Sequence, residues 1–433
     1  MNLRSFAILA LLVVTVCLER CGYYGARSFL SLDLHQEGTS TSSIGMMYSA
    51  LQAILIVGTL LGGALALAVG PRAAAAAAAL LATCGHFVHA AGAPVMVGAA
   101  ITALGAGLFR PCPYAAAAET LVWDDPSPAA PGPHRYSAVA AFAVIAYAAV
   151  NLGGLVAPAL GGFLRDQASP SIARASMGAV TLLAALAAGG AALIAWLGVR
   201  TNKDRAGAGP YRAATPGAGE TPSPPLGMAL GGLALLMPVE AVFMLGSSAG
   251  VPPFELLDGK DAAWLMAVNP IVTIFISTGL FALLLTAAIQ RWTLPPLLVL
   301  GAGLCVYGVG LAVLAAAGTS KAGFVIGSGI TGAGEPACFA IPIAYAAIAK
   351  RGRAAALIIA VWMTAGQIVS VVTNALSVYP ITRIPLLVLG VLVALGGGAA
   401  LIALGRRMHS AFFDAPAPAA PAPWPPAPWP PSP

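Results

Sequence analysis

The sequence predicts an all-α membrane protein whose helices cross the bilayer twelve times, in two groups of six. Three observations carry this prediction: the composition, the spacing of the apolar runs, and a polar break near the middle of the chain. Of the 433 residues, 59% are hydrophobic and only 8% are charged, and the mean hydropathy is +0.88. Soluble domains carry about 25% charged residues, so the composition excludes a soluble protein.

Each predicted span is an apolar run long enough to cross the hydrocarbon core, which takes about 20 residues of helix. Before the polar break, such runs cover residues 5–32, 43–69, 73–92, 95–122, 135–164 and 173–199. After it, they cover residues 225–249, 261–289, 294–317, 320–349, 352–378 and 384–405. The chain therefore divides into two sets of six spans.

The polar break predicts the domain boundaries. It holds Lys203, Asp204, Arg205 and Arg212 in a Pro- and Gly-rich stretch, which is typical of a flexible linker. We expect an N-terminal six-helix bundle (1–199), a cytoplasmic linker (200–225), a C-terminal six-helix bundle (226–405) and a Pro-rich cytoplasmic tail (406–433). The tail repeats Pro, Ala and Trp from residue 415, a composition that favours polyproline II, and we assign it no role in transport.

The loop charges predict the orientation. If the N-terminus is cytoplasmic, thirteen of the 21 Lys and Arg residues fall on the cytoplasmic side, as the positive-inside rule requires. Both termini then lie in the cytoplasm, and we expect an integral protein of a bacterial cytoplasmic (inner) membrane. The net charge of +6 follows from this loop bias, so we expect no nucleic-acid partner. The six cysteines lie in apolar runs without metal-like spacing; we expect no metal, no cofactor, and a monomer.

Charged residues inside the first span point to a polar pathway. A charge near the bilayer centre costs about 2.5–3.5 kcal/mol even on the lenient insertion scale, so such residues mark functional paths. Arg20, Tyr24 and Arg27 fall at i, i+4 and i+7, which is one face of a helix, and Glu19 precedes them. This stripe predicts the lining of a path for an anionic or zwitterionic solute.

Further charges within spans are few. Arg110 lies in the fourth, Glu240 in the seventh and Glu335 in the tenth. The arginines thus come from the N-terminal half, and Glu240 and Glu335 from the C-terminal half. A cavity between the halves would match a short peptide, with its carboxylate toward Arg27 or Arg110 and its ammonium toward Glu335. Guanidinium suits this task because its planar donors hold a carboxylate at two points.

Six spans on each side of a linker resemble the plan of the major facilitator fold, in which two bundles rock about a midplane site. Six motifs in order further resemble the proton-dependent oligopeptide transporter (POT) family. Residues 16–25 resemble its Glu-x-x-Glu-Arg-Phe-x-Tyr-Tyr-Gly signature, 105–111 its Gly-x-Gly-x-Phe-Lys-Pro and 147–153 its Tyr-x-x-x-Asn-Leu-Gly, and Asn269-Pro270, Glu335 with Pro342, and Trp362 match its eighth, tenth and eleventh helices. The resemblance spans residues 16 to about 370.

The resemblance implies a role for each matching residue. It assigns to the substrate, as contacts for the peptide carboxylate, backbone amides, amino terminus and side chain, Tyr24, Arg27, Arg110, Tyr147, Asn151, Asn269, Glu335 and Trp362. It assigns to proton coupling Glu19, Arg20, Glu240 and Glu335. No cofactor is implied beyond the proton as coupling ion.

Three departures from the family pattern bear on coupling. Val16 occupies the place of the first glutamate of the signature, the residue that the family most associates with protons. Arg110 replaces a lysine, and arginine stays charged under ordinary conditions. Glu240 lies one turn before the position of the family's seventh-helix acid, near Phe243. Coupling by Glu19 or Glu335 and uncoupled facilitation therefore both remain open.

The sequence predicts a secondary active transporter of di- or tripeptides or peptide-like compounds that works by alternating access with protons. Within the transporter class, the alternative is an uncoupled facilitator or an exporter of drugs or metabolites. From another class, the alternative is a ligand-binding receptor or scaffold that no longer transports. An enzyme is not expected, because the chain has neither a His-Glu-x-x-His nor a Gly-x-Ser-x-Gly motif.

Overall fold

The computed structural model describes residues 3–36, 38–123, 133–206, 261–290, 295–318, 320–348, 354–377 and 380–413. Within these ranges the chain is helical apart from short turns. Most of the predicted linker, the seventh span with Glu240, and most of the predicted tail lie outside them. Residues 200–206, predicted as the start of the linker, are instead helical.

The helices follow the predicted runs closely. The first part of the chain forms α1 (Leu3–Gln36), α2 (Thr41–Val69), α3 (Pro71–Ala90), α4 (Val95–Phe109), α5 (Cys112–Ala118), the π-helix η1 (Glu119–Trp123), α6 (Pro133–Gln167) and α7 (Pro170–Ala206). The second part forms α9 (Asp261–Gln290), α10 (Pro296–Ala317), α11 (Lys321–Ile348), α12 (Ala354–Ser377) and α13 (Pro380–Phe413). Within the described residues, ten helical stretches are long and apolar enough to cross a membrane. The prediction of an all-α polytopic membrane protein is confirmed.

The fourth predicted span is not one continuous helix. It breaks at Arg110 and Pro111, because proline has no N–H for the helical ladder, and resumes as α5. Its last turns widen into η1, where Glu119 pairs with Arg72 at 3.3 Å. Glu119 thus lies at the junction of α5 and η1, and Arg110 lies at an interruption within the span.

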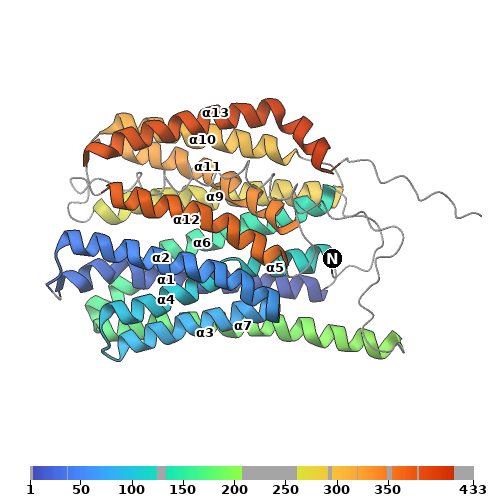
Figure 1. Cartoon of the computed structure of the whole chain (residues 1–433), viewed down its shortest axis with the longest axis horizontal. Helices are drawn as coiled ribbons and strands as arrows, with labels where there is room; N and C mark the ends of the chain where they lie inside the picture. The colour runs from blue at the N-terminus through green and yellow to red at the C-terminus, as the bar shows by residue number, and fades with distance from the viewer. Residues whose placement is uncertain are drawn as a thin grey trace, which may run out of the picture.

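Figure 1 shows how the helices are arranged. Helices α1 to α7 pack together on one side of the molecule, with α3 against α4 and α7, and α1 against α6 and α7. Helices α9 to α13 lie on the other side, where α10 packs against α11 and α13. Helix α6 also contacts α9 and α11, and α2 contacts α12. Helix α5 makes smaller contacts with α11 and α12. Among the described helices, α2, α5 and α6 thus join the first part of the chain to α9, α11 and α12 of the second.

Glycines of the sequence motifs sit where helix backbones meet. A Cβ at Gly107 would lie 2.5 Å from the carbonyl oxygen of Leu55 in α2. A Cβ at Gly153 would lie 2.8 Å from the carbonyl oxygen of Cys17 in α1. Only a residue without a side chain permits these approaches, so both glycines fix helix packing.

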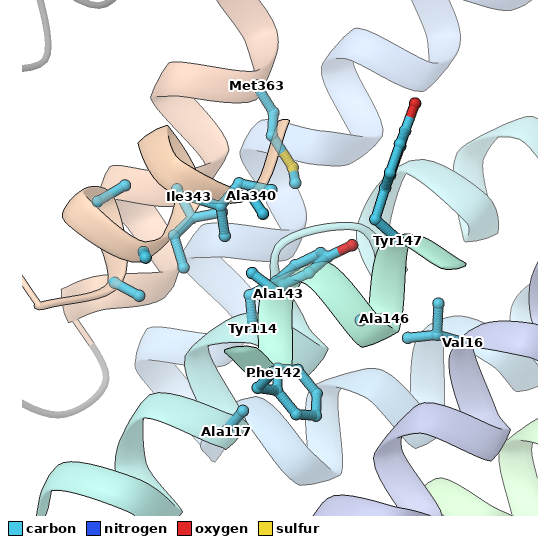
Figure 2. Close-up of a cluster of buried hydrophobic side chains, with 14 of the residues drawn as sticks. Val16, Tyr114, Ala117, Phe142, Ala143, Ala146, Tyr147, Ala340, Ile343 and Met363 are labelled. Carbon is cyan, nitrogen blue, oxygen red and sulfur yellow. The ribbon is translucent and has the colours of Figure 1, made fainter. Parts of the chain in front are cut away.

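An apolar core joins α1, α5 and α6 to α11 and α12 (Figure 2). Its labelled members are Val16, Tyr114, Ala117, Phe142, Ala143, Ala146, Tyr147, Ala340, Ile343 and Met363. Val16 is 2% exposed. The position at which the family signature has its first glutamate is therefore part of the packed core here.

Candidate functional site

A buried carboxylate marks the junction between the two parts of the chain. Glu335 is 7% exposed. Its Oε2 accepts a hydrogen bond of 2.9 Å from the Tyr147 hydroxyl, and its Oε1 accepts one of 2.7 Å from Nδ2 of Asn269. The hydroxyl of Thr273 lies 3.4 Å from Oε2 and shares its one hydrogen between this atom and the carbonyl oxygen of Gly332. Three of the residues predicted to bind substrate, Tyr147, Asn269 and Glu335, thus lie in direct contact.

Prolines shape this cluster. Asn269 and Glu335 are each followed by a proline inside their helices α9 and α11. Pro336 has no N–H, so the carbonyl one turn earlier, at Gly332, loses its helical donor. The Thr273 hydroxyl donates to that oxygen at 3.1 Å. This hydrogen bond links α9 to α11 beside the carboxylate of Glu335.

The ring of Tyr147 is held by the same helix that carries the acid. Phe339, one turn after Glu335, stacks on Tyr147 with ring centroids 4.3 Å apart. This stacking holds the phenol of α6 over α11, so its hydroxyl meets Oε2. All three donors to Glu335 are neutral, and no described cationic side chain forms an ion pair with it. Its negative charge is uncompensated within the described part of the chain.

The charged residues of the signature form a second cluster on α1. Nε of Arg20 lies 2.7 Å from Oε2 of Glu19, and both side chains are buried. Arg20 also donates to the carbonyl of Ala106 at 3.4 Å and lies over the ring of Tyr23, 5.2 Å from its centroid. Arg110 interacts electrostatically with both members of the pair. Two cations and one anion thus meet beside the break after α4.

The other predicted substrate residues lie around these clusters. Tyr24 lies against α6, where a Cβ at Gly154 would be 3.4 Å from its ring. The amide of Asn151 donates to the carbonyl of Tyr147 in its own helix, at 3.0 Å. Trp362 is fully buried, and its Nε1 has no hydrogen-bond partner among the described residues. Within the described part of the chain, none of these three side chains forms a hydrogen bond with Glu335. Glu240 lies outside the described residues.

Arg27 lies in a separate cavity between α1, α2, α3 and α4. Its guanidinium lies over the ring of Tyr48, 5.9 Å from the centroid, and the Tyr48 hydroxyl donates to the Arg27 carbonyl at 2.9 Å. Gln52 lines the same cavity. Tyr48 of α2 thus both lines the cavity and forms a hydrogen bond to α1.

The structure contains one ion cluster, around Asp33, that the sequence does not predict. Asp33 of α1 accepts from Nη1 of Arg165 in α6 through Oδ1, and from Nη2 of Arg174 in α7, 2.7 Å away, through Oδ2. In the sequence the two arginines read as loop charges. The one available signal is that Asp33 directly follows the first apolar run, so a slightly longer helix carries it between two neighbouring helix ends.

Two histidines of α3 are buried. His86 and His89 are 3% and 8% exposed. Both line the cavity of Arg27. They are buried because α3 packs on both α4 and α7.

Comparison with solved structures identifies the fold. No protein-family model and no curated protein sequence matches the chain. Among solved structures, an auto-inhibited POT family peptide transporter matches with a TM-score of 0.58 and 18% identity, over 92% of this chain and 96% of that one. A mutant peptide transporter POT in complex with alafosfalin matches with a TM-score of 0.61 and 18% identity, over 92% of this chain and 94% of that one. The chain has the fold of these transporters. The resemblance predicted from six short motifs therefore extends to the whole helical arrangement.

Proposed function

We propose that this protein is a secondary active transporter that moves di- or tripeptides, or peptide-like compounds, across a membrane by alternating access coupled to protons. The main support for this proposal is Glu335. It is a buried carboxylate that accepts hydrogen bonds only from neutral donors, where α6 meets α9 and α11. A solute with an ammonium group supplies the missing positive charge. The fold shared with two peptide transporters supports this assignment.

The charge of the two clusters suits a zwitterion. An ammonium group bound at Glu335 would face a carboxylate with unused lone pairs, since each oxygen of a carboxylate can accept more than one hydrogen bond. The opposite end of a peptide is a carboxylate, and the N-terminal helices offer Arg20, Arg27 and Arg110 to it. A neutral solute would leave Glu335 and the excess positive charge of the N-terminal helices without compensation, because Glu19 pairs with only one of the three arginines.

We extend the described helices to twelve spans in two six-helix bundles, which is the major facilitator arrangement, in a monomer with both termini in the cytoplasm of a bacterial inner membrane. The contacts between the bundles support a gate. Tyr136, near the start of α6, donates to the carbonyl of Ile341 at 3.2 Å, and its ring lies 4.8 Å from that of Tyr345. In the predicted orientation this closed end is cytoplasmic, as it is in an outward-facing state.

We assign proton coupling to Glu19, Arg20 and Glu335, because Val16 has no ionisable group. Glu19 is held by Arg20 and lies within electrostatic range of Arg110. A substrate carboxylate that draws either arginine away removes the partner that keeps Glu19 ionised, so Glu19 then takes up a proton. Glu240 stays a candidate for the same role.

Uptake of labelled dialanine into proteoliposomes tests the proposal, with and without an inward proton gradient and with a counterflow control. Gradient-driven accumulation is the expected result. Counterflow without accumulation would mean an uncoupled facilitator, and binding without flux would identify a receptor or scaffold. Flux of drugs or metabolites in the absence of dialanine flux would identify an exporter.

A further inference from the structure

The cavity between α1, α2, α3 and α4 holds an arginine without a carboxylate partner. Arg27 forms a hydrogen bond with Tyr23 and lies over the ring of Tyr48. No described Asp or Glu lies within ion-pair distance of its guanidinium. Phenol groups stabilise the cation without neutralising it. The cavity therefore carries one uncompensated positive charge within the described part of the chain.

Two buried imidazoles line the same cavity. His86 and His89 are more than nine-tenths buried, and Nε2 of each has no hydrogen-bond partner among the described residues. An unpaired polar atom at such burial costs about 1–3 kcal/mol, so a ligand or water that satisfies it is favoured. The remaining polar wall consists of Gln52 and the Thr102 hydroxyl.

The surroundings of the two histidines differ. His89 also lines a second cavity, where Arg165 and Arg174 share the single carboxylate of Asp33. A proton on His89 would therefore meet a net positive cluster. His86 lines only the cavity of Arg27 and packs on α7 at Gly178, where a Cβ would lie 3.2 Å from the Cβ of His86.

The ionisable and charged groups around these histidines come from five helices. They are Tyr23, Arg27 and Asp33 of α1, Tyr48 of α2, Arg165 of α6 and Arg174 of α7, together with each histidine for the other, while α4 contributes only the uncharged Thr102. Arg27 is the cation that lines the same cavity as His86. An anion bound in this cavity would stabilise a proton on His86.

We propose that this cavity is a proton-linked carboxylate site, in which Arg27 holds the carboxylate and Nε2 of His86 takes up one proton from solvent as the carboxylate binds. The site rests on the proposed function in one respect: the natural carboxylate is the carboxyl end of the transported peptide. It adds a proton acceptor on α3 to a chain whose signature lacks the acid at Val16. The carboxylate adds one negative charge and the proton one positive charge. The net charge of the cavity is therefore the same before and after binding.

Isothermal titration calorimetry on the full chain in nanodiscs tests this proposal. Dialanine, alanyl-alanine amide and acetate are titrated at several pH values, each in two buffers with different enthalpies of ionisation. The buffer dependence of the heat counts the protons taken up. We expect net uptake for dialanine and acetate but not for the amide, and a loss of dialanine affinity of up to about tenfold per pH unit as the pH rises.

Two variants locate the proton. His86→Gln keeps a donor and acceptor of similar reach but cannot titrate, so proton uptake should vanish and the affinity should become independent of pH. His89→Gln is the matched comparison on the same helix, and proton uptake should persist in it. Equal uptake in wild type and His86→Gln, or uptake lost only in His89→Gln, overturns the assignment. A melting temperature measured for each variant separates loss of folding from loss of titration.

The same data separate this site from the proposed function. Dialanine binding without proton uptake overturns the proton-linked site and leaves peptide transport standing. Acetate binding with proton uptake, in the absence of any dialanine binding, supports the site and overturns the peptide assignment. If neither carboxylate binds, both proposals fail.

Discussion

Glu335→Gln is the substitution that tests the proposed site most directly. It keeps the size of the side chain and one carbonyl oxygen, but it removes the negative charge that Tyr147, Asn269 and Thr273 surround. The new amide nitrogen is a donor and would face donors on these neighbours. An ammonium group of the substrate would then meet a neutral amide in place of a buried carboxylate.

The size of the effect follows from the burial of the carboxylate. Truncating one partner of a buried, hydrogen-bonded charge pair costs about 2–5 kcal/mol. At about 1.4 kcal/mol for each factor of ten, this corresponds to dialanine affinity roughly 30-fold to several thousandfold weaker. Because Glu335 is only 7% exposed, water cannot replace the lost contact, and we expect the upper part of this range.

The assay compares dialanine with N-acetyl-dialanine, which has no ammonium group. Glu335→Gln should lose dialanine uptake and counterflow, whereas the smaller binding of the acetylated compound should be the same in both proteins. A melting temperature near that of wild type is the control for folding. Dialanine uptake at the wild-type rate by a stable Glu335→Gln protein would remove this residue from the site.

Three further predictions concern packing, ion pairing and the gate. Gly107→Ala should lower stability by about 1–3 kcal/mol because the new Cβ would clash with the backbone of α2. Gly189→Ala should raise stability by up to about 1 kcal/mol through helix propensity, because no atom lies within 4 Å of the new Cβ. Thermal melting in detergent compares the two variants. Asp33→Asn should cost about 1–3 kcal/mol because it removes the buried carboxylate that accepts from the partly exposed Arg174, and an unchanged melting temperature would contradict this. Gly63 of α2 lies against α12, where an added Cβ would be 2.8 Å from the Cβ of Ala360, and we assign this contact to the same gate as Tyr136. Gly63→Leu should therefore abolish uptake while the protein stays folded, and normal uptake would exclude this contact from the gate.

The positions of the helices could be predicted from the sequence because the bilayer imposes one rule on every span. Eleven of the predicted runs coincide with described helices, and the seventh lies outside the described residues. The interruption of the fourth run at Arg110 was not predicted, although Pro111 is visible in the sequence. Hydropathy averages over a window, so it is insensitive to a break of a single turn.

The site could be predicted only in part. Tyr147, Asn269 and Glu335 were assigned to the substrate by resemblance, and the structure joins them by hydrogen bonds. The sequence does not predict the contacts of Thr273 with Glu335 and with the carbonyl oxygen of Gly332. A hydroxyl inside an apolar run does not indicate its partner until the neighbouring helices are known. The Asp33 cluster was missed for the same reason: its partners come from helices far apart in the sequence.

The charge balance of α1 and its neighbours connects Val16 to the requirement for an anion. Arg20, Arg27 and Arg110 bring three positive charges to the N-terminal helices, and Glu19 is the acid that pairs with one of them. A glutamate at position 16, as in the family signature, would reduce the excess, but Val16 packs in the apolar core instead. Uncompensated charges at low dielectric are costly. An incoming carboxylate would therefore compensate part of this positive excess. Under the proposed coupling, the proton that accompanies it binds a group other than residue 16.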